Sequence, residues 1–268
     1  MHTGDAAPSP VRLIVIPLII FLIWVLETFL LEGSLGVFPR YQPVVYFMYV
    51  LVACILIGTF APVLLLKSGF LSGAVNMYQA GFRSLRRTVI TAGITAGLGY
   101  IILGAAVPSG SSPARLIGPI LFLLPVAVSS VMVCWVLIGT HWQAYVRQYG
   151  AFVSIVSGIA VTGVLFGISF AAHSPPLSDP RYILIAIGIG AATAVIFFAI
   201  RDVWATVIFA SFALAAFTHD LIDPAYATPV SLPVVLSSIL ALLALAVSEW
   251  YLMKRFITIR IPAQKRGS

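Results

Sequence analysis

Long apolar runs dominate this sequence and leave few folds open to it. Eight such runs cover residues 13–31, 44–66, 89–107, 116–138, 152–172, 182–200, 203–218 and 232–253. Most approach the roughly 20 residues that an α-helix needs to cross about 30 Å of hydrocarbon. Only 9% of the residues are charged, whereas soluble domains carry about 25%. We therefore expect an all-α integral membrane protein with about eight transmembrane helices, and we exclude a soluble globular domain.

Short polar segments separate the apolar runs. Pro39 and Pro108 fall where helices should end, because proline lacks an amide donor. The seventh run follows the sixth after only Arg201 and Asp202, so we expect these two helices to form a tight hairpin at the membrane surface. The connections are too short for a separate soluble domain, and residues 1–268 are therefore interpreted as one membrane domain.

Basic residues are divided unequally between the two membrane faces. If the helices alternate in direction, twelve of the fifteen lysines and arginines fall on the side of the chain termini, and only Arg40, Arg115 and Arg181 fall on the other. Short cytoplasmic loops retain an excess of positive charge. We therefore expect both termini in the cytoplasm, with the protein in the plasma membrane. The net charge of +7 then reflects how the chain is oriented in the lipid bilayer, and no nucleic-acid partner is expected.

Residues 70–87 have the pattern of an amphipathic helix. Apolar residues recur there three or four positions apart, while arginines and amides fill the other faces. Such a helix lies in the membrane interface with its arginines among anionic headgroups, so we expect a cytoplasmic interfacial helix. Small residues four positions apart, which let helices approach closely, occur at Gly93 and Gly97, Gly163 and Gly167, and Gly188 and Ala192.

Ionisable residues within the apolar runs are candidates for function, because a charge in hydrocarbon is costly. Glu27 lies deep in the first run, where a hydrogen-bonded structural role is the simpler interpretation. Glu249 precedes Lys254 and Arg255 by about one turn, and we expect it to pair with them at the cytoplasmic rim. The other polar groups gather at the ends of the fourth, fifth and seventh runs: His141, Gln143, Arg147, His173, His219, Asp220 and Asp223.

The stretch from Gly139 to Asp223 resembles the core of the CPBP family, the CAAX-protease and bacteriocin-processing membrane proteins. The matching text is WQAYVR at residues 142–147, LFGISFAAHSPP with His173, and GIGAATAVIFFAIRDVW. In that family, paired glutamates are followed by an arginine, a Phe-x-x-x-His motif, a basic turn with tryptophan, and a His-x-x-x-Asn or Asp motif. The resemblance implies an intramembrane-protease core over about residues 116–223, with His173 pointing into the bundle.

The residues that carry the family's chemistry are partly replaced in this chain. Trp142 and Gln143 stand at the positions of the paired glutamates, and neither is an anionic zinc ligand or a general base. The third motif of the family can be aligned with this sequence in two ways. The tryptophan of the preceding turn places its histidine near Ser211, whereas distance along the chain selects His219 with Asp223. The resemblance thus implies His173, Arg147, His219 and Asp223 as candidate catalytic residues.

Two functional interpretations follow. The first is a CPBP-like protein that is catalytically impaired or silent and binds a membrane-embedded peptide or protein; zinc is implied by the resemblance alone, and enzyme activity stays an open question. The second is a small-molecule transporter or a structural membrane subunit. A continuous helix from Arg147 to His173 would separate these residues by about 39 Å, so only a break near Gly150 would bring them together.

Overall fold

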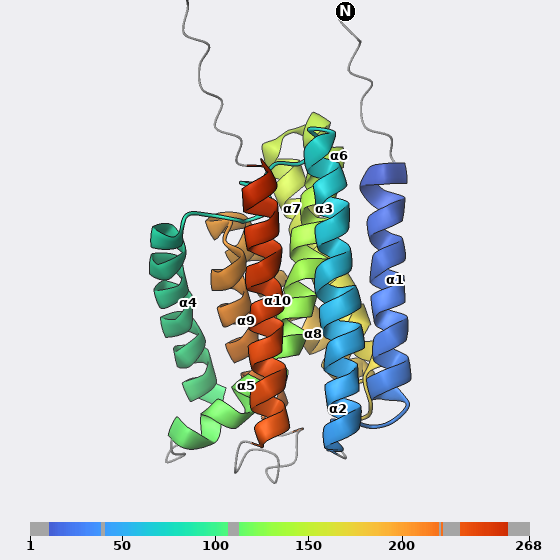
Figure 1. The fold of residues 1–268 in the computed structure, drawn as a ribbon, viewed down its shortest axis with the longest axis vertical. Coiled ribbons are helices and arrows are strands. Elements are labelled where there is room, and N and C mark those ends of the chain that lie inside the picture. The colour runs from blue at the N-terminus through green and yellow to red at the C-terminus, as the bar shows by residue number, and fades with distance from the viewer. Residues whose placement is uncertain (1–10, 39–40, 107–112, 220, 222–230, 257–268) are drawn as a thin grey trace, which may run out of the picture.

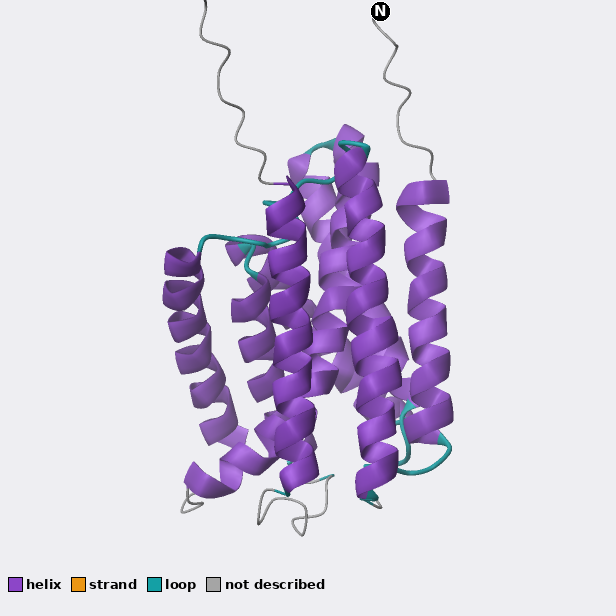
Figure 2. Ribbon diagram, in the orientation of Figure 1, coloured by secondary structure: helices purple, strands orange, loops and turns teal. Residues whose placement is uncertain are grey.

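The structure is a computed structural model that describes residues 11–38, 41–106, 113–219, 221 and 231–256. These residues form an upright bundle of helices (Figure 1). The chain passes along the bundle eight times within the described residues. Figure 2 shows that the described part is helical throughout, with short connecting loops and no strand. The expectation of an all-α membrane protein is therefore confirmed.

Among the first four passes, the third is the single helix α4, and the other three are each assembled from several helical segments. Their bounds are η1 (Val11–Val15), α1 (Ile16–Thr28) and η2 (Phe29–Gly33); α2 (Pro43–Tyr49), η3 (Val50–Phe60) and α3 (Ala61–Leu71); α4 (Leu85–Ala106); and α5 (Pro113–Ser130), η4 (Val131–Gly139), α6 (Thr140–Val146) and η5 (Arg147–Tyr149). Segments η1 to η4 are π-helical and continue the neighbouring α-helices, whereas η5 is a short 3-10 turn.

The last four passes are simpler. They comprise α7 (Ala151–Ser169) with the 3-10 turn η6 (Phe170–Ala172), α8 (Pro180–Ile200), α9 (Val203–Thr218) and α10 (Leu232–Phe256). Seven helices of the described chain are long and apolar enough to span a membrane, and α9 is a shorter apolar helix. All eight expected passes are thus present, and the chain is an integral membrane protein that lies in a lipid bilayer.

The fourth pass is the centre of the bundle and α4 lies at its edge. Every side chain of η4 is buried, including Cys134 and Trp135. In contrast, α4 exposes most of its surface and packs chiefly against α9, as its outlying position in Figure 1 indicates. An apolar helix can be exposed on this scale only where lipid surrounds it.

The connection between α8 and α9 is the tight hairpin that the sequence predicts. Arg201 ends α8 in the left-handed conformation with φ of 54°. Asp202 then caps α9 by accepting a hydrogen bond from the Ala205 amide at 3.0 Å. The same carboxylate accepts hydrogen bonds from Thr88 and Thr91 of α4 at 2.8 and 3.1 Å. One buried aspartate thereby closes the hairpin and holds α4 beside α9.

The expected interfacial helix is wrong, because residues 72–84 form turns between α3 and α4. Gly73 and Gly81 have φ of 70° and 85°, which interrupt a right-handed helix. Asn76 and Gln79 exchange side-chain to backbone hydrogen bonds at 2.8 and 3.1 Å, which stabilise a turn instead. The apolar spacing has another cause, since the turns bury Val75 and place other apolar side chains against the bundle.

Close helix packing through small residues occurs at only one of the three predicted pairs. A Cβ atom on Gly163 would lie 3.0 Å from the Ala191 amide nitrogen, and one on Gly167 would lie 2.1 Å from Ile187 Cγ1. This pair therefore sets the approach of α7 to α8. Gly93, Gly97 and Gly188 have nothing within 4 Å of such a Cβ, so the prediction is wrong for them.

Replacing Gly167 with alanine should lower the free energy of unfolding by about 1–3 kcal/mol, because the new methyl group also meets the Ile187 backbone nitrogen at 2.8 Å. Thermal unfolding in detergent measures the effect. Gly188→Ala on α8 is the matched control and should unfold like the parent, since open space surrounds that position. Equal stability of the two variants would contradict the packing described.

Candidate functional site

The candidate residues from the sequence lie at two opposite ends of the bundle. We call the end that carries Arg83, Arg87, Arg147, Arg201 and Lys254 the basic end. The His173 end is opposite, because the 19 residues of α7 span about 28 Å between Arg147 and His173. Gly150 does break the helix, with φ of 100°, but Arg147 remains exposed beyond it.

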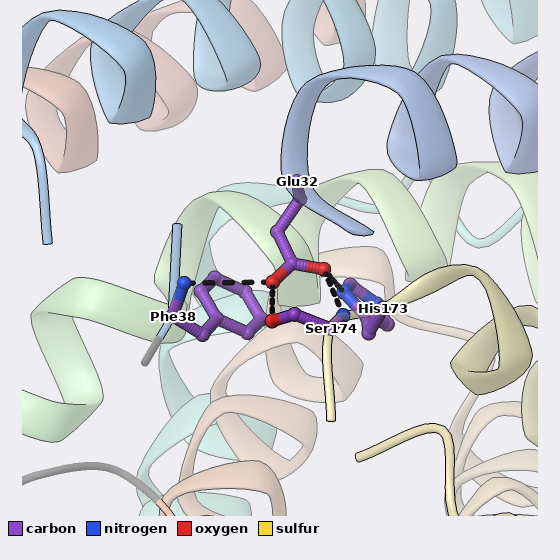
Figure 3. A network of polar contacts seen from close by, with 4 residues as sticks. All are labelled: Glu32, Phe38, His173 and Ser174. Carbon is purple, nitrogen blue, oxygen red and sulfur yellow. Dashed lines mark hydrogen bonds and ion pairs between the residues drawn. The ribbon is translucent and has the colours of Figure 1, made fainter. Parts of the chain in front are cut away.

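His173 points into the bundle, as expected, and its partner is Glu32. The imidazole is 4% exposed and its Nδ1 lies 2.8 Å from Glu32 Oε2. The amide of Ser174 donates to the same oxygen at 2.9 Å, and the Ser174 hydroxyl donates to Oε1. The Phe38 amide completes the set at 3.4 Å. Figure 3 shows the carboxylate of Glu32 extending down between these three residues.

This cluster joins the end of the first pass to the segment that follows α7. Because a carboxylate only accepts hydrogen bonds, Nδ1 of His173 carries the proton that faces Glu32. The Ser174 hydroxyl also donates to Glu32, so its proton is not directed at the imidazole as a nucleophile's proton would be. Phe38 stacks on the imidazole with ring centroids 5.2 Å apart. We interpret the cluster as a latch between η2, at the end of the first pass, and the loop after α7.

Sequence reasoning did not find Glu32. It places the end of the first apolar run at residue 31, which leaves Glu32 in a loop. In the structure η2 extends the first pass to Gly33 and carries Glu32 to a fully buried position. The available signal was the same that singled out Glu27: an ionisable residue adjoining hydrocarbon is costly unless it has partners. Glu27 itself is only partly buried.

At the basic end, Trp142 and Gln143, which the resemblance aligns with paired glutamates, take part in hydrogen bonds within the bundle. The Gln143 side chain is 7% exposed, and its Oε1 accepts a hydrogen bond from Arg201. Trp142 donates its ring N–H to Ser157 at 3.0 Å. Arg201 also donates to the carbonyl of Gln79 at 2.9 Å. The guanidinium therefore fills the space beside Gln143.

The Arg201 environment disfavours additional positive charge. Burial, together with the nearby Arg83 guanidinium, lowers the pKa of Arg201 to about 10. Burial and Arg87 likewise lower the pKa of Arg83. A metal ion placed at the motif position would face this guanidinium and two side chains that offer it no carboxylate. These residues do not fit a zinc ion. Within the described part of the chain, no three histidine, cysteine or acidic residues gather as metal ligands.

The remaining candidates are scattered. His141 is buried, and its Nδ1 lies 2.8 Å from the Leu137 carbonyl of the preceding turn. Ser211 is buried in α9 and donates to the Val207 carbonyl at 2.8 Å. His219 follows α9 at the His173 end, where the Phe217 ring lies 5.6 Å from that of Phe170. Asp220 and Asp223 lie outside the described residues.

A third feature, which sequence reasoning missed, is a cavity of about 760 Å³ between α4, α9 and α10. We call it the lateral groove. Its floor is formed by α9 and its two walls by α4 and α10. The groove reaches the surface that faces lipid, since Val89 and Trp250 in its walls are more than half exposed. Its lining residues are Arg83, Leu85, Thr88, Val89, Ala92, Trp204, Ile208, Ala246, Glu249, Trp250, Met253 and Lys254.

Glu249 lies in the wall of the lateral groove, and its predicted pairing with Lys254 and Arg255 is wrong. Its Oε2 accepts a hydrogen bond from the ring N–H of Trp204 at 2.6 Å. Lys254 instead places its ammonium 4.9 Å from the centre of the Trp250 ring, and Arg255 donates to the Tyr251 hydroxyl at 3.1 Å. Lysine and arginine on the last turn therefore lie over aromatic rings or beside a phenol, and the carboxylate remains directed into the groove.

Comparison with known proteins finds a short likeness. No protein-family pattern matches the chain, and no solved structure matches it. A stretch of 50 residues is 40% identical to part of ABC transporter G family member 12 from Dictyostelium discoideum. It covers 19% of this chain and only 8% of that protein's length. A likeness of this extent shows neither a family nor an activity.

Removing the latch carboxylate should destabilise the bundle. Glu32→Ala leaves the imidazole of His173 and the hydroxyl of Ser174 buried without their acceptor, which should lower the free energy of unfolding by about 3–5 kcal/mol. Thermal unfolding in detergent is the measurement. Glu27→Ala on the same pass is the control, with a much smaller expected loss because that residue is partly exposed. Similar losses in both variants would exclude the latch.

Restoring one glutamate of the family motif should stabilise the chain without making it a protease. In Gln143→Glu a carboxylate accepts the hydrogen bond from Arg201, and the buried Gln143 Nε2, which has no partner in the structure, is removed. We expect a gain of about 1 kcal/mol in the free energy of unfolding. The exposed Gln148→Glu is the control, with no change expected. Stoichiometric zinc binding or peptide cleavage by Gln143→Glu would contradict the assignment of Arg201 as its partner.

Proposed function

We propose that this chain is a membrane-embedded binding protein whose lateral groove holds an apolar peptide or protein segment without cleaving it. The observation that carries the proposal is the groove itself. It is open toward lipid, its walls are apolar over most of their length, and it lies between a peripheral helix and the bundle. A segment already in the bilayer can enter such a groove sideways without crossing the polar interface.

The size of the groove supports side-chain recognition. Ligand sites generally have volumes of about 300–1,000 Å³, and 760 Å³ lies within that range. This volume accommodates the side chains on one face of a helix, in the manner of an apolar helix face bound in a groove. Ala92 and Ala246, on facing walls, provide room between the bulkier Trp204 and Trp250.

Several contacts argue for binding without catalysis. In the two polar clusters at the bundle ends, the Glu32 carboxylate accepts hydrogen bonds from His173 and Ser174, and Gln143 Oε1 accepts one from Arg201. Within the groove Glu249 is the only acidic side chain among the described lining residues. The nearby acid Asp202 accepts hydrogen bonds from Thr88, Thr91 and the Ala205 amide, so it is engaged in holding the helices and does not pair with Glu249 as the acid and base of an amide-hydrolysing set. We therefore propose that the resemblance to the CPBP family extends to the fold and to the binding of a membrane-embedded segment, and that it does not extend to proteolysis.

The transporter and structural-subunit alternatives have no comparable support. The 50-residue likeness to a transporter covers too little of either chain to favour transport. For orientation, we propose that the basic end faces the cytoplasm in the plasma membrane. The support is the concentration of arginine and lysine at that end, which agrees with the retention of positive charge in short cytoplasmic loops.

A designed transmembrane peptide of about 20 leucine and alanine residues tests the proposal in reconstituted vesicles. A photo-crosslinking residue at Ala246, in the groove wall, should capture the peptide far more than one at the lipid-exposed Leu243 of the same helix. Ala92→Phe should reduce this capture to background because the ring fills the groove. Ile94→Phe, on the exposed side of α4, is the matched control and should leave it unchanged. Equal capture at both positions, or cleavage of the peptide, would refute the proposal.

A further inference from the structure

Glu249 is an acidic side chain in the wall of an otherwise largely apolar groove. Among the described residues, the Trp204 ring N–H donates a hydrogen bond to Oε2 of this carboxylate, and the other oxygen accepts none. The two cations that also line the groove have other partners: Lys254 lies over Trp250, while Arg83 donates to the Arg201 carbonyl at 2.8 Å and stacks on Tyr78. In the described part of the chain, Glu249 forms no ion pair.

A carboxylate in this position requires an electrostatic partner when the groove is filled. An occupant that excludes water from Glu249 removes the hydration of its charge, and an unpaired charge in hydrocarbon is costly. Binding of a purely apolar occupant would therefore carry the free-energy cost of desolvating the Glu249 carboxylate. An occupant with a cationic group beside the carboxylate would offset this cost.

We propose that the segment bound in the lateral groove carries a lysine or arginine whose cationic group pairs with Glu249. This inference rests on the proposed binding function and names the chemistry of its partner. The aromatic surfaces strengthen it, because Trp204 and Trp250 flank the carboxylate in the groove lining and indole faces attract cations. Lys254 already uses the Trp250 ring in this way, at 4.9 Å from its centre.

The position of Glu249 along α10 determines the level at which the cationic group of the partner must lie. Glu249 precedes Lys254 by five residues, which is about 7.5 Å along α10. The carboxylate of Glu249 thus lies about one and a half helical turns farther from the basic end than Lys254 does. A long lysine or arginine side chain reaches such a level from a partner helix while its stem stays against apolar walls. A partner with its cation at the rim itself would instead meet Arg83 and Lys254.

Three peptide probes test the pairing in vesicles of neutral phosphatidylcholine. Each is a leucine and alanine helix of about 20 residues, with lysine, methionine or glutamate at one position that lies at the level of Glu249. Fluorescence energy transfer to the labelled protein measures affinity. We expect the lysine peptide to bind about tenfold more tightly than the methionine peptide, and the glutamate peptide to bind least. This ranking is measured on the parent protein, so it does not depend on the folding of any variant.

Two substitutions locate the origin of the ranking. Glu249→Gln should abolish the preference for the lysine peptide while it retains binding of the methionine peptide. Glu27→Gln, a partly exposed carboxylate in another transmembrane pass, should keep the preference. If the parent protein binds all three peptides equally, or if Glu249→Gln keeps the preference, the pairing is wrong although the groove still binds peptides. If no peptide binds the parent protein, the proposed function itself fails, and this inference fails with it.

Discussion

The absence of water from the hydrocarbon core governs how this chain uses its polar groups. Backbone donors and acceptors must be satisfied within helices, and buried side chains must find partners inside the bundle. Most threonines and serines in the passes accordingly donate to a carbonyl one turn earlier, as Thr162 does to Gly158 at 2.8 Å. The larger polar side chains are concentrated at the two ends, in the Glu32 latch and around Arg201. The middle of the fourth pass is left almost entirely apolar.

This separation keeps the residues that the resemblance to the CPBP family singles out at two opposite ends of the bundle. Arg147 and His173 flank one uninterrupted helix, so their proximity in the sequence places them at opposite membrane faces. Each end then recruits polar partners from elsewhere in the chain: Glu32 comes from the first pass, and Arg201 from the hairpin after α8. The two clusters contribute to the stability and geometry of the bundle, while the lateral groove presents the accessible carboxylate.

Much of the fold could be predicted from the sequence, and much of the site could not. Apolar length alone defines the eight passes, and the two residues Arg201 and Asp202 predict a tight hairpin. Partner choice is different, because Glu32 and His173 are 141 residues apart and no local pattern links them. Similarly, the charge of Glu249 suggests a neighbour one turn away, whereas the structure selects Trp204 of α9. The spacing of apolar residues in 70–87 misled because the turns bury only Val75 and Phe82 of that series, whereas Leu71, Tyr78 and Leu85 are exposed.

The attachment of α4 has a consequence for how the groove responds to an occupant. Asp202 fastens the beginning of α4 to α9, and Gly99 lets α4 contact Phe212 closely farther along, but the wall formed by α10 is anchored separately in the bundle. Because α4 packs against α9 near Asp202 and again near Gly99, an occupant that widens the groove has to separate the pair of helices α4 and α9 from α10, which packs on α5 and η3. The two walls of the groove thus belong to different packing units of the bundle.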